Sequence, residues 1–148
     1  FDANLQTAQT NFIAALAQCE AAVAIFREQK AGHLVTISSM SAMRGLPRNL
    51  TTYAATKAGL AALTEGIRAE LIKTPIKVTT IFPGYIETEL SGKSAGKTPL
   101  MVDGESGSRA LVAAIEREPA TACVPAWPWT VMGWLMRNLP LGMVAKMT

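Results

Sequence analysis

The stretch His33-Leu-Val-Thr-Ile-Ser38 decides the fold class that this sequence predicts. It is short and β-prone, which is typical of a strand buried on both faces of a parallel sheet. A second run, Lys77-Val-Thr-Thr-Ile-Phe82, predicts the next strand and is cut by Pro83-Gly84. Residues Thr121 to Val124 predict a third, shorter strand.

The segments around these strands predict helices over residues 4–29, 52–73 and about 106–117. Gly32 is expected to break the first helical pattern, and Thr51 or Thr52 to cap the second helix. Helices of this length are what a crossover between parallel strands requires. The alternation of helix and strand therefore predicts an α/β protein, with a Rossmann-like doubly wound parallel sheet in a single domain over residues 1–148.

The composition excludes several classes of protein. Of the 148 residues, 49% are hydrophobic and 17% are charged, which is incompatible with intrinsic disorder. The net charge of +3 is small and scattered, so we expect no nucleic-acid partner. Cys19, Cys123 and the single histidine, His33, form neither a disulfide framework nor a usual zinc site. Reduced thiols predict a cytoplasmic protein.

Two further features concern membranes and processing. No apolar run approaches the ~18–20 residues of a spanning helix. The chain begins with Phe1 and enters a helical pattern with no signal peptide, so we interpret it as a fragment or a processed chain.

The pair in Tyr53-Ala-Ala-Thr-Lys57 is the most informative local feature. Helix positions four apart lie on one face, so the phenol and the ammonium group share one space. A tyrosine with a pKa of ~10 is a poor general base at neutral pH, and a nearby cation lowers that pKa because it favours the phenolate. Tyr53 is therefore a candidate acid/base, whereas a solvated lysine stacked on a surface tyrosine is the simpler interpretation.

Other polar residues follow the predicted strands at positions where a ligand of this pair would bind. Ligands of open α/β sheets collect at the carboxyl ends of the strands, where Ser38 and Ser39 follow the first strand. Together with Asn11, the pieces Leu34-Val-Thr-Ile-Ser-Ser39, Tyr53-Ala-Ala-Thr-Lys57-Ala-Gly and Pro83-Gly-Tyr-Ile-Glu-Thr88 appear in order. In these motifs, over about residues 1–90, the chain resembles the short-chain dehydrogenase/reductase family.

The resemblance implies a role for each matching residue. Tyr53 resembles the proton donor and acceptor of the family, and Lys57 the residue that lowers the tyrosine pKa and binds the nicotinamide ribose. Ser39 resembles the group that holds the substrate carbonyl or hydroxyl, and Asn11 the residue that anchors a water in the proton relay. The segment that packs on the nicotinamide and bonds its carboxamide is matched by Pro83, Gly84, Ile86 and Thr88.

The sequence departs from the family pattern in two ways. Ser39 lies 14 residues before Tyr53, one more than the commonest spacing, which leaves Ser41 and Ser38 as lesser candidates. The glycine-rich turn for the pyrophosphate and the residue that selects NAD or NADP do not occur in the sequence. We therefore expect the carboxyl-terminal portion of a reductase, with the opening βαβα unit before Phe1 and negligible turnover by the isolated chain.

The function implied by the resemblance is hydride transfer between NAD or NADP and a carbonyl/alcohol pair in the complete protein. A hydrophobic alcohol or ketone is the favoured substrate, by analogy with the family. A homo-oligomer through helices 4–29 and 52–73 is expected, although their alanine-rich faces also suit packing against a sheet. The alternative is a non-catalytic module for dimerisation or regulation.

The remaining features carry simpler expectations. Cys19 and Cys123 are expected to be buried small hydrophobes, His33 an exposed residue at a strand start, and Thr88 either a cofactor contact or a helix N-cap. Residues 91–109, rich in Gly, Ser, Lys and Pro, predict a mobile substrate loop.

The apolar tail, residues 125–148, has three interpretations: a lid and wall of the substrate pocket, an oligomer contact, or an interfacial membrane anchor. Pro128 and Pro140 argue against one continuous amphipathic helix in it. In the third interpretation the residues that face lipid are Trp127, Trp129, Trp134, Leu135 and Met136. The residues that face the headgroups are Arg137 and Lys146.

Overall fold

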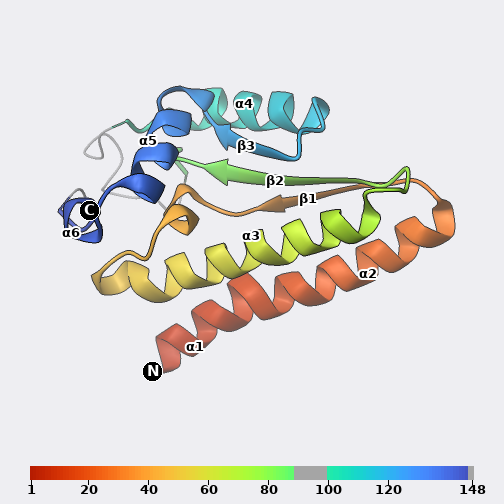
Figure 1. Cartoon of the computed structure of the whole chain (residues 1–148), viewed down its shortest axis with the longest axis horizontal. Helices are drawn as coiled ribbons and strands as arrows, with labels where there is room; N and C mark the ends of the chain where they lie inside the picture. The colour runs from red at the N-terminus through yellow and green to blue at the C-terminus, as the bar shows by residue number, and fades with distance from the viewer. Residues whose placement is uncertain (89–99, 147–148) are drawn as a thin grey trace.

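A computed structural model describes residues 1–88 and 100–146 of the chain. Its centre is a parallel sheet with strand order β1-β2-β3, formed by β1 (His33–Ile37), β2 (Lys77–Pro83) and β3 (Thr121–Val124) (Figure 1). In the register, His33 lies opposite Lys77 and Thr80 lies opposite Thr121. The predicted α/β class and its three parallel strands are confirmed.

Helices cover both faces of this sheet. Helices α2 (Ala14–Gln29) and α3 (Thr51–Leu71) lie side by side on one face, and α4 (Gly104–Glu116) lies on the other (Figure 1). The remaining elements are α1 (Asp2–Ala8), the π-helical turn η1 (Gln9–Ile13), the 3-10 turns η2 (Met40–Met43) and η3 (Arg48–Leu50), α5 (Ala126–Asn138) and α6 (Leu141–Val144). The helix expected over residues 4–29 is thus one long helix interrupted by a π turn.

Apolar side chains fill both interfaces of the sheet. Between the sheet and helices α2 and α3 lies a buried cluster of Cys19, Leu34, Leu71, Ile76 and Val78. On the opposite face, Ala114 of α4 packs on Ile81 and Val124. Burial raises the pKa of the Cys19 thiol, as expected of a small hydrophobe. Cys123 is only half-buried, and burial raises its pKa too.

The sequence predicts burial on both faces for β1, and this prediction is wrong; β2 is the strand that is buried on both faces. Residues Val78 to Phe82 of β2 are all buried. In β1, by contrast, Val35 is half-buried and Ile37 is 43% exposed. The reason is that α4 packs mainly over β2 and β3, so it covers this side of β1 only in part, at Val35.

Two predicted helix ends are also wrong. Neither Thr51 nor Thr52 caps α3: its N-cap is Leu50, and the Thr51 hydroxyl donates to the carbonyls of Leu46 and Arg48. The left-handed residue that ends α2 is Lys30, with φ of 54°. Gly32 matters for packing instead, because a β-carbon there would overlap the ring of Phe26.

Buried hydroxyl groups in the sheet are paired. The Thr36 and Thr64 hydroxyls lie 2.8 Å apart and join β1 to α3. His33, expected to be exposed, is half-buried, with its Nε2 2.8 Å from the Thr79 hydroxyl. Thr79 donates in turn to the Pro119 carbonyl, so the predicted exposure of His33 is wrong because its ring lies against the buried start of β2. These pairings avoid the cost of burying an unsatisfied polar group.

The loop expected over residues 91–109 lies only partly among the described residues. Residues 91–99 lie outside the described residues, but Gly104 to Arg109 form the first turns of α4, so the loop prediction is wrong there. The Asp103 carboxylate caps α4 by accepting a hydrogen bond from the Ser106 backbone N–H at 2.8 Å. This places the helix start two residues before Ser106. Thr88, the other candidate N-cap, is the last described residue before the gap at 89–99, so a helix after it would lie outside the described residues.

The apolar tail folds back on the domain. Trp129 and Met136 are 5% and 8% exposed, so the prediction that they face lipid is wrong: each packs into an apolar cluster with η2 or α3. Trp127 and Trp134 are 77% and 64% exposed. Among the helices that the structure describes, none combines the length and apolar character required to cross a bilayer.

Candidate active site

Tyr53 and Lys57 occupy the first turns of α3, beside the carboxyl end of β1. The Lys57 ammonium nitrogen lies 5.9 Å from the centroid of the Tyr53 ring, which is within the range of a cation–π interaction. Both side chains are half-buried. The helix therefore brings the phenol and the cation together, as their spacing of four residues predicts.

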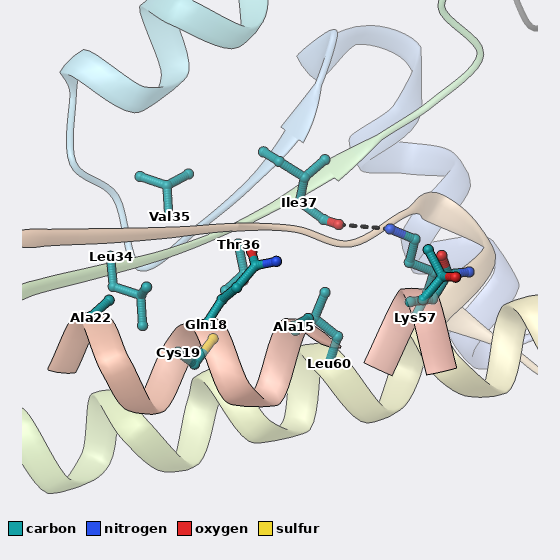
Figure 2. Close-up of a pocket in the computed structure, with 12 residues that line it drawn as sticks. Ala15, Gln18, Cys19, Ala22, Leu34, Val35, Thr36, Ile37, Lys57 and Leu60 are labelled. Atoms are coloured by element: carbon teal, nitrogen blue, oxygen red, sulfur yellow. Dashed lines mark hydrogen bonds between the residues drawn. The ribbon is translucent and has the colours of Figure 1, made fainter. Parts of the chain in front are cut away.

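A backbone carbonyl holds Lys57 in this position. Its ammonium group donates a hydrogen bond of 2.9 Å to the Ile37 carbonyl oxygen at the end of β1, as Figure 2 shows. Burial lowers the pKa of the Lys57 ammonium. The lysine is thus a positioned, partly desolvated cation and not a freely solvated surface residue.

The two adjacent serines after β1 have different surroundings. Ser38 is buried, and its hydroxyl donates to the Lys57 carbonyl at 2.8 Å, which ties β1 to α3. Ser39 is half-buried and begins η2, where its hydroxyl oxygen accepts a hydrogen bond from the Ser41 backbone N–H at 3.1 Å. The Ser39 hydroxyl proton is therefore available to a ligand in a way that the Ser38 proton is not. This difference favours Ser39 over the neighbouring candidate.

Asn11 lies in the π-helical turn η1 and contacts α3. Its side-chain nitrogen donates to the Thr56 hydroxyl at 3.4 Å, and that hydroxyl donates to the Tyr53 carbonyl at 2.8 Å. Single π turns inside α-helices are frequent at functional sites. The structure thus joins Asn11 to the Tyr53 turn through one hydroxyl group.

The segment from Pro83 to Thr88 leaves β2 at the same edge of the sheet. Its backbone is held by hydrogen bonds from Gly84 N–H to the Val124 carbonyl and from Glu87 N–H to the Val102 carbonyl, each 2.8 Å. Ile86 forms a parallel bridge with Val102. The segment is therefore fixed in an extended course by the strand and loop beside it.

Sequence reasoning missed three groups at this site. The first two are the Thr56 hydroxyl and the Ile37 carbonyl, and the third is Trp129. The Trp129 ring packs edge-on to Tyr85, with centroids 5.3 Å apart, and a β-carbon at Gly84 would overlap the indole. The Trp129 indole N–H has no hydrogen-bond partner among the described residues. Only Thr56 had a local signal, as the residue beside Lys57; the indole comes from a helix 45 positions beyond Gly84 in the chain.

A cavity of about 430 Å³ adjoins this group of residues. It lies between α2 and β1, and Lys57 and Asn11 line its end nearest the candidate site. The remainder of its wall is largely apolar, from residues such as Ala15, Leu34 and Leu60 (Figure 2). The outer edge of β1 faces no strand among the described residues.

These features define a Rossmann-like α/β protein with a candidate ligand site at the carboxyl edge of its sheet. A family model described as short chain dehydrogenase matches residues 2–98. The chain belongs to the short chain dehydrogenase family.

Relatives and solved structures agree with this assignment. An uncharacterized oxidoreductase of Mycobacterium tuberculosis (strain ATCC 25618 / H37Rv) is 51% identical over 138 residues, which cover 93% of this chain and 54% of the relative. The chain spans about half the length of the curated relatives that it matches.

Two solved structures share the fold. A short chain dehydrogenase from Burkholderia cenocepacia J2315 in complex with NADP is 24% identical, with a TM-score of 0.77 over 93% of this chain and 58% of that chain. A short-chain dehydrogenase from Sphingobium yanoikuyae in complex with NADPH is 21% identical, with a TM-score of 0.70 over 88% of this chain and 54% of that chain.

Proposed function

We propose that the complete protein is an NAD(P)-dependent oxidoreductase that transfers a hydride between the nicotinamide and a carbonyl/alcohol substrate, with Tyr53 as the acid/base. One observation carries this proposal. The Lys57 ammonium is held at 2.9 Å from the Ile37 carbonyl and 5.9 Å from the Tyr53 ring, at the carboxyl edge of a parallel sheet. This is where a cation stabilises a phenolate beside a bound ligand.

The residues of this chain suit one half of a dinucleotide. Tyr53 and Lys57 offer an O–H and an N–H donor to ribose hydroxyls. The extended backbone of Gly84 to Thr88 suits a flat ring and its carboxamide, as the family resemblance implies for Pro83, Gly84, Ile86 and Thr88. The glycine-rich turn for the pyrophosphate does not occur in these 148 residues, so the other half of the dinucleotide needs groups from elsewhere.

In this proposal the protein orients the substrate and moves a proton. The bound nicotinamide supplies or accepts the hydride. The Ser39 hydroxyl donates a hydrogen bond to the substrate carbonyl oxygen, and Tyr53 gives its proton to the same oxygen as negative charge develops there. Lys57 stabilises the phenolate that remains, and Asn11 holds the water that returns a proton to Tyr53.

Replacement of Tyr53 by Phe tests this function directly. In the full-length protein, with NADPH or NADH and a panel of hydrophobic ketones, Tyr53→Phe removes the proton donor, so kcat falls about 100- to 10,000-fold. The fold, followed by circular dichroism, stays intact because only one oxygen is lost. A variant that retains more than about a tenth of the wild-type rate, only ~1.4 kcal/mol of barrier, would show that another residue is the acid.

Three finer points belong to the same proposal. The substrate is a hydrophobic alcohol or ketone, the protein works in the cytoplasm, and it forms a homo-oligomer. Exposed stripes of small residues support the oligomer, because they let helices of a second copy approach closely. On α2 these residues are Ala14, Ala17, Ala21 and Ala24, and on α3 they are Ala55, Ala62, Gly66 and Ala69.

The same stripes favour the second candidate function, a non-catalytic module for dimerisation or regulation. The two functions predict different results for the full-length protein. An enzyme oxidises NADPH or NADH in the presence of a ketone, and Tyr53→Phe abolishes this. A module oxidises neither, and its Tyr53→Phe variant binds its partner as tightly as the wild type.

A further inference from the structure

Helix α5 presents an apolar surface to solvent, with aromatic groups at its centre. Trp127 is 77% exposed, Trp134 is 64% exposed and Val131 is 45% exposed. Val131 and Trp134 are three residues apart, so they lie on one face of the helix. Leu141 and Met143 of α6, 56% and 53% exposed, belong to the next helix of the same tail. We refer to Trp127, Val131 and Trp134 as the tryptophan face.

The opposite side of α5 fixes the orientation of this face. Trp129, Gly133 and Met136 are buried, and their spacing of four and three residues places them on one side of the helix. A β-carbon at Gly133 would lie 2.9 Å from the Met40 side chain, so the helix sits tightly on η2. Val144, 1% exposed, anchors α6 in the same way. The tryptophan face is therefore held outward by a packed core.

The tail that carries the face has only basic charges. From Pro119 to the end of the chain the sequence has no Asp or Glu, and its charged side chains are Arg137 and Lys146, both exposed. Arg137 follows Trp134 by three residues on the outer side of α5. With Arg117 and Trp134 it lines a groove of about 430 Å³ that also runs along β3. Two guanidinium groups thus stand beside an exposed indole.

We propose that the tryptophan face docks the protein on the surface of an anionic lipid bilayer. Indole rings favour the boundary between hydrocarbon and headgroups because they combine a large apolar ring with one N–H donor. Arg137 and Lys146 meet the negative headgroups, to which juxtamembrane basic residues contribute about fivefold in affinity each. The absence of acidic side chains from this part of the sequence removes the repulsion that such a surface would meet.

This contact is peripheral and independent of the proposed hydride transfer. The apolar side chains enter only the headgroup boundary, while buried Trp129 and Met136 keep α5 attached to the domain. A bilayer surface is also where hydrophobic alcohols and ketones concentrate. Docking there would present the protein to such substrates.

Flotation of the full-length protein with vesicles tests the proposal. The vesicles are made of phosphatidylcholine alone or of phosphatidylcholine with about 30 mol% phosphatidylglycerol. The second composition gives a negatively charged surface. We expect the wild type to float with the anionic vesicles and much less with the neutral ones. Trp127→Ser with Trp134→Ser should weaken binding at least about tenfold, because the interfacial aromatic groups are lost.

A matched control separates this face from general surface hydrophobicity. Ile72→Ser with Val112→Ser removes apolar side chains that are 77% and 54% exposed, one at the C-cap of α3 and one on α4. This variant should float like the wild type. Arg137→Gln with Lys146→Gln should weaken binding to the anionic vesicles only.

Three results would overturn the proposal. One is a wild type that does not float with anionic vesicles, and another is equal flotation of the tryptophan variant and the wild type. The third is a tryptophan variant whose oligomeric mass falls in sedimentation while vesicle binding is unchanged, which would mean that a second copy covers the face. None of these results depends on Tyr53 chemistry, so the docking surface and the proposed function fail separately.

Discussion

The Lys57 ammonium group and the Ile37 carbonyl are joined by a hydrogen bond of 2.9 Å that links α3 to the end of β1. A second bond runs the opposite way, from the Ser38 hydroxyl to the Lys57 carbonyl at 2.8 Å. Together they set the first turns of α3 against the strand that leads to Ser39. The candidate acid/base and the candidate substrate-binding serine are therefore positioned by two hydrogen bonds that share Lys57.

The surroundings of Lys57 predict a pH dependence of stability. Burial lowers the pKa of Lys57 in the folded protein below its ordinary value of 10.5. Between the folded and unfolded pKa values the unfolded chain binds more protons, so the free energy of unfolding rises with pH in that window. The gain in the free energy of unfolding that comes from deprotonating Lys57 is complete above the pKa of the unfolded chain. It is lost as the pH falls through the pKa of the folded protein.

Urea unfolding at pH 7 and pH 10 measures this contribution as a difference between two variants. Both carry Tyr53→Phe, so that the phenol does not titrate, and one also carries Lys57→Met. We expect the variant with Lys57 to gain stability relative to the Lys57→Met variant as the pH rises. A difference that stays constant would mean that Lys57 is fully solvated.

The two serines after β1 are predicted to respond differently to replacement by alanine. Ser38→Ala removes a buried bond between two elements, so it should lower the free energy of unfolding by about 1–2 kcal/mol. Its kcat should stay close to the wild-type value. Ser39→Ala removes the proposed donor to the substrate oxygen, so kcat should fall about 100-fold or more.

Urea unfolding and steady-state kinetics on both serine variants make the comparison. If Ser38→Ala proves the slower enzyme and Ser39→Ala retains the wild-type rate, the assignment of the substrate contact is reversed. Ser41→Ala serves as the control, since its backbone N–H bonds to Ser39 while its hydroxyl has no bond among the described residues.

Thr56 is predicted to be a positioning residue for Asn11. Thr56→Val keeps the shape of the side chain but removes the hydroxyl that joins the Asn11 amide to the Tyr53 carbonyl. We expect a loss of about 1 kcal/mol in stability and a lower kcat with KM little changed. Thr56→Ser, which keeps the hydroxyl, should restore the rate; equal rates for Val and Ser would contradict the role of this link.

Because the Trp129 indole lies against Gly84, we expect substitutions at these two positions to have non-additive effects on stability. Gly84→Ala introduces a β-carbon where the indole lies, so it should lower stability by about 1–3 kcal/mol through overpacking. Gly45→Ala is the control, because no atom of the described part of the chain lies within 4 Å of a β-carbon there.

A double-mutant cycle with Trp129→Leu isolates that contact. In the Trp129→Leu background the cost of Gly84→Ala should shrink by about 1 kcal/mol or more, because the smaller side chain leaves room. Additive effects of the two substitutions in urea unfolding would show that the strain arises elsewhere.

Much of the fold could be predicted from the sequence because its signals are local. The strand near residues 34–38, the one near 78–82 and the helix that carries Tyr53 and Lys57 each follow from a run of residue types. The spacing of four residues places the phenol and ammonium group on one helix face in any protein. Thr51 failed as a cap because the Leu46 and Arg48 carbonyls, set by the preceding loop, take its hydroxyl.

Other features could not be predicted because they join residues far apart in the chain. Trp129 and Trp134 read alike in the sequence, and only the packing of α5 on η2 buries the first and exposes the second. Ser38 and Ser39 are adjacent and chemically identical, yet one bonds to the Lys57 carbonyl and the other begins η2.

The sequence by itself determined the α/β class, the order of the elements and the residue types that can carry acid/base chemistry, since each depends on periodicity and spacing within a segment. The tertiary structure alone decided which serine keeps an available proton, where the Lys57 cation rests and which indole rings meet solvent. The physical reason is that burial and hydrogen-bond partners are set by segments that meet only when the chain is folded.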